Sequence, residues 1–434
     1  MGSSPPRGVN DIYVYTPEHK LTAEEFAEDS DKFVGLLKHG LGLSEKSVNE
    51  PSQDTIALAM NALEGLIEVV GQEETRYLYC GTESQLNLSK PVATNLMDLL
   101  DNKNVMTLDG VFACLSGLNL LVNGLGIGDG FVVTSDIAKY ERKKGDSADF
   151  TGASGSVAVR TGEGKLLKVD SDFGAFSSNE WDFHKPIEVR GDELSSNVSP
   201  KVDGYFSFAA YVKHIGEAYK DLKDRKNIKL DDFNQVTFHV PYPGITKYAL
   251  AYLRAVELEA TDEIDEKLES IKDLFHNKDS DENYEASLKV AYTDIKGDLK
   301  EFMGDLEKLT PSLKYPSMMG NIYTGSVFLS LASALKHGDY DAGDNILVIG
   351  YGSGSGSTAV IMTTTDQTRK IADAWDFDER LSNRKSLSLS DYNSFRNEGV
   401  MPNNKPHTSS NWHLDKITEF GRRIYSKVKR SSAV

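Results

Sequence analysis

The spacing of hydrophobic residues changes back and forth between two patterns along this chain. Short apolar runs, typical of buried strands, are followed by longer stretches in which apolar residues recur three and four positions apart, typical of amphipathic helices. In the first half, residues 54–70 predict a helix and residues 76–80 a strand. In the second half, residues 245–257 predict a helix and residues 345–349 a strand. This alternation favours βαβ units, in which helices cover buried sheets.

The two halves of the chain also carry a weak internal repeat. Further strands are predicted at 11–15, 131–135, 156–160, 235–240 and 357–362, and further helices at 91–100, directly after residue 114, and at 323–335. The helical segment 117–125 is similar to 325–333, and each of them precedes an apolar strand. The pattern therefore predicts a duplicated α/β layer structure with a functional site where the halves meet.

Two segments depart from this pattern. Residues 259–309 are dense in Asp, Glu and Lys with apolar residues at helical spacing, which predicts a solvated helical excursion without chemistry. The polar stretch after residue 386 keeps an apolar face that we expect to pack back onto the body, formed by Trp412, Leu414, Ile417, Phe420 and Tyr425. The predicted organisation is an N-terminal half at 1–175, a C-terminal half at 176–380 with an acidic helical insertion at about 259–310, and a C-terminal extension at 381–434.

The net charge, the cysteine count and the length of the apolar runs limit which partners and which cellular compartment are expected for this chain. The chain has 48 Lys and Arg against 66 Asp and Glu, a formal net charge of −18 at pH 7, which argues against a nucleic-acid or anionic-membrane surface. Only two cysteines occur, Cys80 and Cys114, so we expect no disulfide framework and a reducing environment. No apolar run is long enough to span a bilayer, and the first residues lack the hydrophobic core of a signal peptide. A cytoplasmic protein is therefore expected.

Cys114 is the strongest candidate for chemistry. It lies between a short apolar run ending at Ala113 and the helix-patterned stretch 118–122, which places its sulfur near a helix N-terminus. Unpaired amide groups and the helix dipole favour a thiolate there, and a thiolate is a nucleophile that can form a covalent acyl intermediate. The alternative is a buried cysteine that behaves as a small hydrophobic residue.

Two further polar residues follow predicted strands. Glu83, in the segment Gly-Thr-Glu-Ser after the strand ending at Cys80, is placed at the edge where α/β proteins bind ligands. A partly desolvated carboxylate can act there as a general acid or base. His239 also follows a strand, and histidine can polarise a carbonyl or donate a proton near neutral pH. The alternatives are a solvated loop glutamate and a hydrogen-bonded core histidine.

A glycine-rich run at 350–356 joins two apolar strands. In that position glycine permits close backbone approach or an oxyanion-binding turn, although such runs are often flexible connectors. The run does not match a nucleotide-binding fingerprint, because no helix with Lys-Ser or Lys-Thr follows it. The spacings HExxH, paired CxxC and HxH do not occur, so we expect no catalytic metal.

With these residues assembled, the chain resembles the 3-hydroxy-3-methylglutaryl-CoA (HMG-CoA) synthase family of the thiolase superfamily. The matching blocks run in the family's order along nearly the whole chain: 81–84 with 89–90, 112–114, 135–140, 151–155, 181–186, 202–211, 238–242, 320–326, 351–354 and 412–425. After Cys114 the chain has Leu-Ser-Gly where many members carry Tyr-Gly-Gly, which is closer to an archaeal variant. The resemblance implies duplicated βαβαβαββ halves that form a five-layered αβαβα core.

The resemblance also implies roles for individual residues. It makes Cys114 the nucleophile, Glu83 the acid/base and His239 the third catalytic residue. The matched blocks nominate as substrate-binding residues Tyr140, Thr151, Ser154, Phe183, Ser207, Asn321 and Ser353. Many members place a lysine near position 244 to hold the CoA phosphates, where this chain has Pro243-Gly244. Lys247 and Lys32 are the remaining candidates for that contact.

The implied reaction forms acetyl-Cys114 from acetyl-CoA and condenses it with acetoacetyl-CoA, giving HMG-CoA and free CoA for the mevalonate route to isoprenoids. CoA thioesters are then substrates and no cofactor is needed. A homodimer or higher homo-oligomer is expected, and association with a thiolase is a further expectation. Three alternatives stay open: a ketoacyl carrier-protein synthase, a homologue that adds β-branches to carrier-bound polyketides, and a non-catalytic scaffold. A ketoacyl carrier-protein synthase would not need Glu83. A surface that docks a carrier protein usually needs basic residues, whereas this chain is strongly acidic. The presence together of Cys114, Glu83 and His239 argues against a non-catalytic scaffold.

Overall fold

Nine strands form one mixed sheet at the centre of the protein. The computed structural model describes residues 7–28, 30–140, 147–190, 193–196, 199–278, 283–399 and 411–427. The strand order is β13-β14-β15-β8-β1-β7-β6-β4-β5. The strands of the first half are β1 Gly8–Tyr15, β4 Tyr77–Gly81, β5 Met106–Gly110, β6 Gly130–Ile137 and β7 Ser154–Gly162. Those of the second half are β8 Leu167–Ser177, β13 Gln235–Phe238, β14 Asn345–Gly352 and β15 Gly356–Thr364.

The two halves of the sheet repeat each other strand by strand. In the first half, β1 and β6 are antiparallel to β7, and β4 is parallel to β6. In the second half, β8 and β14 are antiparallel to β15, and β13 is parallel to β14. Thus β1, β7, β6 and β4 correspond to β8, β15, β14 and β13, and the predicted duplication is confirmed. Among the described residues, the half-sheets are joined by two residue pairs between β1 and β8, Gly8 with Lys168 and Val9 with Leu167.

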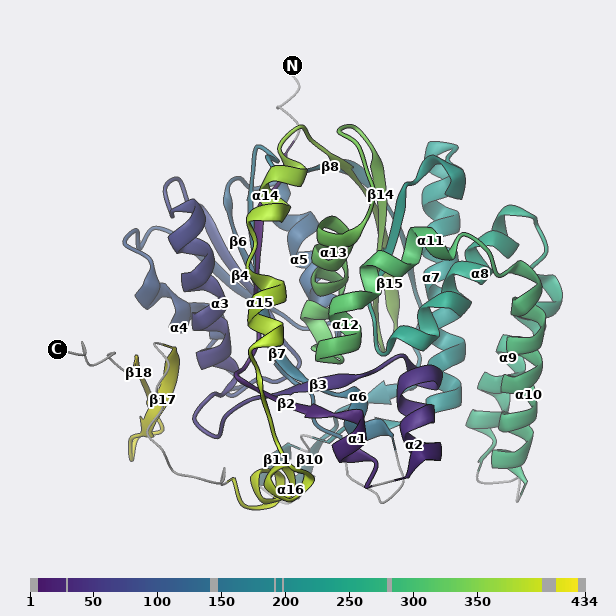
Figure 1. Ribbon diagram of the computed structural model, residues 1–434, viewed down its shortest axis with the longest axis horizontal. Coiled ribbons are helices and arrows are strands. Elements are labelled where there is room, and N and C mark those ends of the chain that lie inside the picture. The colour runs from purple at the N-terminus through teal and green to yellow at the C-terminus, as the bar shows by residue number, and fades with distance from the viewer. Residues whose placement is uncertain are drawn as a thin grey trace.

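Helices cover both faces of each half-sheet (Figure 1). Helix α3 (Thr55–Val70) packs on the outer face of β1, β6 and β7. Helices α5 (Ser116–Leu125) and α13 (Ser326–His337) contact each other between the half-sheets. Helix α7 (Gly204–Lys226) packs on β8, β14 and β15, and α8 (Pro243–Glu257) packs against α7. This arrangement gives the five αβαβα layers that the resemblance predicts.

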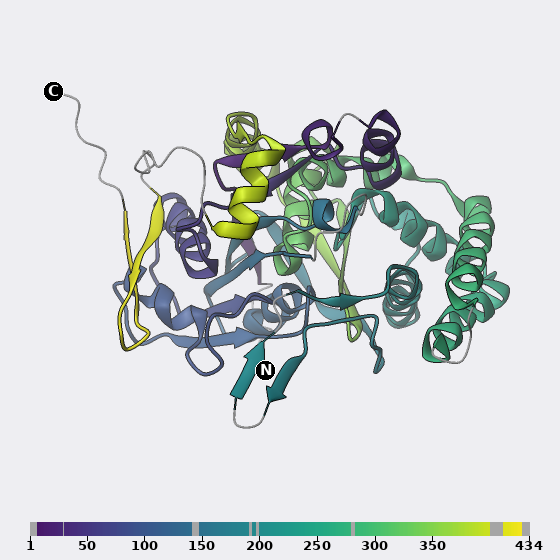
Figure 2. The same ribbon diagram turned by 90° about the horizontal axis from the view of Figure 1, so that it is seen from below.

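The second half departs from the first at one strand. Within its described residues, no strand corresponds to β5 in this sheet. The chain forms instead the predicted helical excursion, with α9 (Asp262–His276) and α10 (Tyr284–Leu299) packed against each other. Figures 1 and 2 both place this pair at one end of the molecule, beyond α7 and α8. The division at 175/176 stays a prediction, and β8 crosses it.

Smaller elements surround this core. They are β2 His19–Thr22, α1 Ala23–Phe26, α2 Asp31–Gly35, β3 Glu45–Val48, α4 Val92–Leu96, α6 Ala148–Thr151, β9 Phe183–His184, β10 Ile187–Arg190, β11 Glu193–Ser196, β12 Lys201–Val202, α11 Leu306–Leu309, α12 Lys314–Met319, α14 Thr368–Ala374, α15 Phe377–Ser382, β16 Lys385–Ser386 and α16 Leu389–Glu398. None of the described helices has the length and apolar character needed to cross a membrane.

The C-terminal extension packs back onto α3 as a hairpin of β17 (Trp412–Ile417) and β18 (Arg423–Lys427). The Trp412 amide donates to Asn61, and Tyr425 packs on the same cluster, as expected. The expectation is wrong for Ile417 and Phe420, which are 51% and 98% exposed, because they lie at the end of β17 and in the turn that follows it. Residues 400–410 and 428–434 of the predicted extension lie outside the described residues.

Candidate active site

Cys114 lies in a tight connection between β5 and α5. Ala113 has a φ of 42°, a left-handed conformation that costs a non-glycine residue free energy and occurs often at functional sites. The Leu115 amide donates to the Phe112 carbonyl at 3.0 Å, which closes the turn. Helix α5 then begins at Ser116. The sulfur is therefore held beside a helix N-terminus, as the sequence predicts.

Glu83 is in direct contact with this cysteine. The Cys114 thiol donates a hydrogen bond to Glu83 Oε1, with 2.9 Å between sulfur and oxygen. The Glu83 side chain is only 5% exposed, so the solvated-loop alternative is wrong. The Lys185 ammonium lies 3.5 Å from Glu83 Oε2 and also donates to the Glu83 carbonyl at 3.2 Å. A thiol, a carboxylate and an ammonium group thus share one buried site.

The expected thiolate is wrong for Cys114 in this state. Burial raises the pKa of the thiol well above its ordinary value, and the charge and hydrogen bond of Glu83 raise it further. Lys185 opposes this rise of the thiol pKa, but as the smallest of the contributions. The cysteine is therefore a neutral thiol whose proton points at a carboxylate. Cys80, by contrast, is a fully buried residue of β4, as expected.

Aromatic rings form a wall around the thiol. Tyr140, Phe183 and Tyr323 lie edge to face, with ring centroids 6.0 to 6.4 Å apart, and cluster with Cys114. Burial raises the pKa of both tyrosines, so their hydroxyls stay protonated. The Lys185 Nζ lies 4.3 Å above the Tyr323 ring. This wall excludes water from one side of the sulfur while leaving hydroxyl donors nearby.

A buried carboxylate that the sequence analysis did not nominate holds the Glu83 loop. Asp136 is fully buried, and its Oδ1 accepts from the Thr82 hydroxyl, the Glu83 amide and the Ser84 hydroxyl at 3.1, 2.8 and 2.9 Å. Its Oδ2 accepts from the amide and hydroxyl of Thr324 at 3.1 and 2.5 Å. Burial, with the Glu83 charge second, raises the pKa of Asp136 to about 6. The only sequence signal was an acidic residue inside an apolar strand.

The loops at this site follow the internal repeat. Glu83 follows β4, and His239 follows β13, the corresponding strand. Ala113 lies three residues before the first residue of α5, and Tyr323 three residues before that of α13. Both have a positive φ, 42° and 46°. A turn of the same kind thus places Cys114 in one half and Tyr323 of the aromatic wall in the other.

His239 is a buried residue that is held through its backbone. Its amide donates to the Ile349 carbonyl at 2.8 Å, and its carbonyl accepts from the Tyr211 hydroxyl at 2.7 Å. Its Nδ1 has no hydrogen-bond partner among the described residues. Burial lowers the pKa of His239 to about 3, so the imidazole is neutral at pH 7. The described side chains of Glu83 and Cys114 make no direct bond to it.

The glycine-rich run forms the turn between β14 and β15 and approaches the cysteine loop closely. A Cβ on Gly352 would lie 2.5 Å from the Phe112 carbonyl oxygen, so no other residue fits. Asp182 anchors the turn by accepting from the Tyr351 hydroxyl at 2.9 Å and the Gly354 amide at 3.1 Å. Ser353 lies half-buried at this turn. The close-approach interpretation is therefore confirmed.

Comparison with known proteins agrees with this geometry. Residues 5–165 match the family model "Hydroxymethylglutaryl-coenzyme A synthase N terminal", and residues 168–432 match the corresponding C-terminal model. The chain belongs to the hydroxymethylglutaryl-CoA synthase family. It is therefore an enzyme of the acyltransferase class, and the resemblance drawn from the motif blocks is confirmed.

Individual relatives span nearly the whole chain. A hydroxymethylglutaryl-CoA synthase of Schizosaccharomyces pombe is 28% identical over 96% of this chain and 98% of its own length. One of the archaeon Haloferax volcanii is 28% identical over 84% of each chain. The solved structure "MvaS in complex with 3-hydroxy-3-methylglutaryl coenzyme A" has a TM-score of 0.79 at 24% identity and covers 98% of this chain and 100% of its own. The Curacin pathway HMG synthase shares the fold, with a TM-score of 0.76 at 20% identity over 98% of this chain and 100% of its own.

The other residues nominated through the family divide into two groups. Asn321 belongs to the site, because its Oδ1 accepts from the amide of Tyr323, a residue of the aromatic wall, at 2.8 Å. The remaining nominees are outside the cluster around Cys114. The Thr151 hydroxyl donates to the Ala148 carbonyl, and the Thr151 carbonyl accepts from the Asn321 amide at 2.8 Å. Ser154 bonds Asn49 and Ser207 bonds the Asp182 carbonyl. Lys247 lies against Tyr248, and Lys32 is exposed on α2.

Proposed function

We propose that this chain condenses acetyl-CoA with acetoacetyl-CoA, giving HMG-CoA and free CoA through an acetyl-Cys114 intermediate. The observation that carries the proposal is the 2.9 Å hydrogen bond from the Cys114 thiol to Glu83. It joins a nucleophile to a carboxylate base inside a buried aromatic wall. That pair suits both an acyl transfer and a later proton abstraction from the bound acetyl group.

In the first step the Cys114 sulfur attacks the acetyl carbonyl while its proton passes to Glu83 Oε1. The bond from the acetyl carbon to the CoA sulfur breaks, and that sulfur takes the proton and leaves as free CoA. Lys185, 3.5 Å from Glu83 Oε2, balances the carboxylate charge before and after this transfer. Because the site is buried, these charges interact more strongly than they would in water.

In the second step Glu83 removes a methyl proton from acetyl-Cys114. A thioester makes this proton more acidic than an oxygen ester would, which explains the choice of cysteine. The resulting carbanion attacks the ketone carbon of acetoacetyl-CoA, and the ketone oxygen becomes a hydroxyl by receiving the proton that Glu83 took from the methyl group. The neutral His239 imidazole donates a hydrogen bond to that oxygen. Water then cleaves the bond from carbonyl carbon to sulfur, and Cys114 regains its proton.

Product identification tests the proposal. Incubation with acetyl-CoA and acetoacetyl-CoA is expected to release HMG-CoA and one equivalent of free CoA, measured by mass spectrometry. An acetyl adduct on Cys114 with acetyl-CoA alone excludes the non-catalytic scaffold. Turnover only with carrier-bound acyl groups contradicts the proposal and favours the polyketide-branching alternative.

The His239→Ala variant is expected to lose condensation by roughly a hundred-fold, as for a missing oxyanion donor, with acetylation of Cys114 less affected. Its melting temperature should change little, because the His239 ring bonds no described side chain. The matched control is His214→Ala. His214 is a buried histidine whose Nε2 lies 2.8 Å from the hydroxyls of Ser178 and Ser355. The control should cost about 1–3 kcal/mol of stability. Loss of stability with unchanged kinetics in His239→Ala would make that residue structural.

A homodimer through β5 is the oligomeric state that we propose. β5 is an edge strand, and Met106, Leu108 and Val111 on or beside it are 49%, 47% and 66% exposed. An exposed apolar edge is a ready template for pairing with a second copy across a two-fold axis. Association with a thiolase stays a prediction, as does the cytoplasmic location, which rests on two unpaired cysteines.

The Leu108→Lys variant is expected to sediment as a monomer at micromolar concentration where the wild-type chain sediments as a dimer. A charge on the edge strand opposes pairing with an identical strand. Val69→Lys, which alters an exposed apolar residue on α3, away from β5, is the control and should stay dimeric. Equal mass of the wild-type chain and both variants would place the interface elsewhere.

A further inference from the structure

The last step of the proposed reaction forms a new negative charge beside Glu83. The proton that Glu83 takes from the methyl group goes to the ketone oxygen, so Glu83 is a carboxylate again when water attacks the thioester. Hydrolysis then converts the carbonyl group on Cys114 into a second carboxylate. The sulfur that carries this group lies 2.9 Å from Glu83 Oε1. Because two like charges repel strongly in a buried site, this step needs a nearby cation.

Lys185 places a cation at this point. Its side chain is 19% exposed, and its Nζ lies 3.5 Å from Glu83 Oε2, while Glu83 Oε1 contacts the Cys114 thiol. One carboxylate group therefore separates the ammonium from the sulfur. Burial raises the pKa of Cys114 and of Asp136, and the charge of Lys185 lowers both. The ammonium is thus close enough to act on a charge that forms at the thioester carbon.

Lys185 also keeps hydrogen-bond donors for a further anion. Among the described residues, its hydrogen bond goes to the Glu83 carbonyl at 3.2 Å. The 3.5 Å contact with the Glu83 carboxylate is longer than the roughly 2.8 Å of a charge-assisted hydrogen bond. The rings of Tyr323 and Phe183, with centroids 4.3 and 5.8 Å from Nζ, stabilise a cation without neutralising it. Since an ammonium carries three donors, some remain for an incoming carboxylate.

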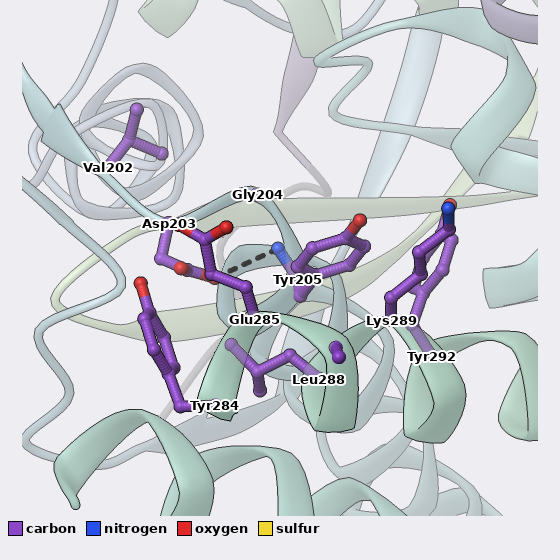
Figure 3. A pocket seen from close by; sticks show the side chains of 10 residues that line it. Val202, Asp203, Gly204, Tyr205, Tyr284, Glu285, Leu288, Lys289 and Tyr292 are labelled. Carbon is purple, nitrogen blue, oxygen red and sulfur yellow. Dashed lines mark hydrogen bonds between the residues drawn. The ribbon is translucent and has the colours of Figure 1, made fainter. Parts of the chain in front are cut away.

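The short ladder of β9 and β12 fixes the chain just before Lys185. Val202 of β12 pairs with Phe183 of β9, and the Asp203 amide donates to the Asp182 carbonyl at 3.2 Å. Figure 3 shows Val202 and Asp203 where this ladder meets α7, and its dashed line marks the hydrogen bond by which Asp203 caps that helix. The ladder therefore ties Lys185 to the first turn of α7.

We propose that Lys185 binds the carboxylate that hydrolysis forms from the acyl group on Cys114, and thereby promotes the release of HMG-CoA. The proposal rests on the proposed function, since it assigns a residue to the last step of that function. Water adds its oxygen to the thioester carbon, and the bond from that carbon to sulfur breaks. One proton of the water restores the Cys114 thiol, and the other leaves to solvent as the product becomes a carboxylate. The Lys185 ammonium contacts the oxygen that becomes negative.

The test compares Lys185→Met with Lys185→Arg and with the control Lys201→Met. Methionine keeps most of the aliphatic packing and removes the charge, arginine keeps the charge, and Lys201 is an exposed lysine of β12. With both substrates, Lys185→Met is expected to accumulate the HMG-CoA adduct on Cys114, measured by intact-protein mass spectrometry. Decay of this adduct should slow by roughly a hundred-fold or more, as for a lost group that stabilises a developing anion. Lys185→Arg and Lys201→Met should release HMG-CoA with little adduct.

The species that accumulates distinguishes the possible roles of Lys185. Acetyl-Cys114 as the main species in Lys185→Met means that the lysine acts through Glu83 before condensation, which overturns the proposal. Lost turnover without an adduct and with a lowered melting temperature makes the lysine structural and also overturns it. Unchanged turnover in Lys185→Met, or an equal adduct in Lys185→Arg, shows that the charge is not needed for hydrolysis. A wild-type chain that forms no acetyl-Cys114 contradicts the proposed function itself.

Discussion

Replacing Cys114 by serine is expected to abolish the acetyl adduct and to reduce HMG-CoA formation by roughly 10⁴-fold or more, the scale seen when a covalent nucleophile is removed. The site already holds the thiol neutral, because burial and Glu83 raise its pKa. A serine hydroxyl is a far weaker acid than a thiol, so the same surroundings leave it without a usable nucleophilic form. The hydrogen bond to Glu83 can persist, so the fold should be retained.

The measurement is intact-protein mass spectrometry after incubation with acetyl-CoA, beside a steady-state assay and a melting curve. Cys80→Ala is the control, because Cys80 is the other cysteine and lies fully buried in β4. It should form the adduct on Cys114 as the wild-type chain does. An acetyl group found on Cys80, or on the introduced serine without loss of turnover, contradicts the assignment.

Glu83→Gln is expected to separate the two steps of the reaction. Carbon–carbon bond formation should fall by roughly a hundred- to ten-thousand-fold, as for a lost general base. Acetylation should fall much less for an electrostatic reason. The charge of Glu83 and its acceptance of the thiol proton both raise the pKa of Cys114, so glutamine lets that pKa fall. More thiolate then forms without a base, whereas no such compensation exists for the methyl proton.

Two assays on one preparation check this prediction. The rate of acetyl-Cys114 formation is compared with the rate of HMG-CoA release, and the pH profile of thiol alkylation reports the pKa of Cys114. The alkylation profile should move to lower pH in Glu83→Gln. Glu68→Gln, an exposed glutamate of α3, is the control and should move neither rate. Equal loss of both steps with an unmoved profile would make Glu83 structural.

Most strands and helices of the fold could be predicted from the spacing of hydrophobic residues along the chain. The predicted strands and helices of both halves occur, and the similarity of 117–125 to 325–333 marks helices α5 and α13, which occupy equivalent places between the half-sheets. The expectation of one apolar face after residue 386 was only partly right. The chain forms a hairpin there, and Ile417 and Phe420, at and beside its turn, are exposed. The order of apolar residues does not show which of them lie at a turn.

The sequence indicated where the residues of the site lie in the chain, but not which of them contact one another. A cysteine before a helix and polar residues after strands indicated Cys114, Glu83 and His239 from local order alone. The sequence did not reveal Asp136, because an acidic residue inside an apolar strand has no local signature of its partners. Lys185 lies 102 residues from Glu83 in the chain, and only folding brings the two together.

Sequence by itself determined the order of elements, the duplicated halves, the loops that carry the reactive residues and the family. These properties depend on residue spacing and on which side chains favour burial, and both are local. Tertiary structure alone decided the protonation state of Cys114, the hydrogen bonds by which Asp136 holds the Glu83 loop, and the contact of Lys185 with Glu83. A pKa depends on every charge and on the amount of water within a few ångströms, and those neighbours come from distant parts of the chain. For that reason a helix N-terminus predicted a thiolate, and burial beside a carboxylate produced a neutral thiol.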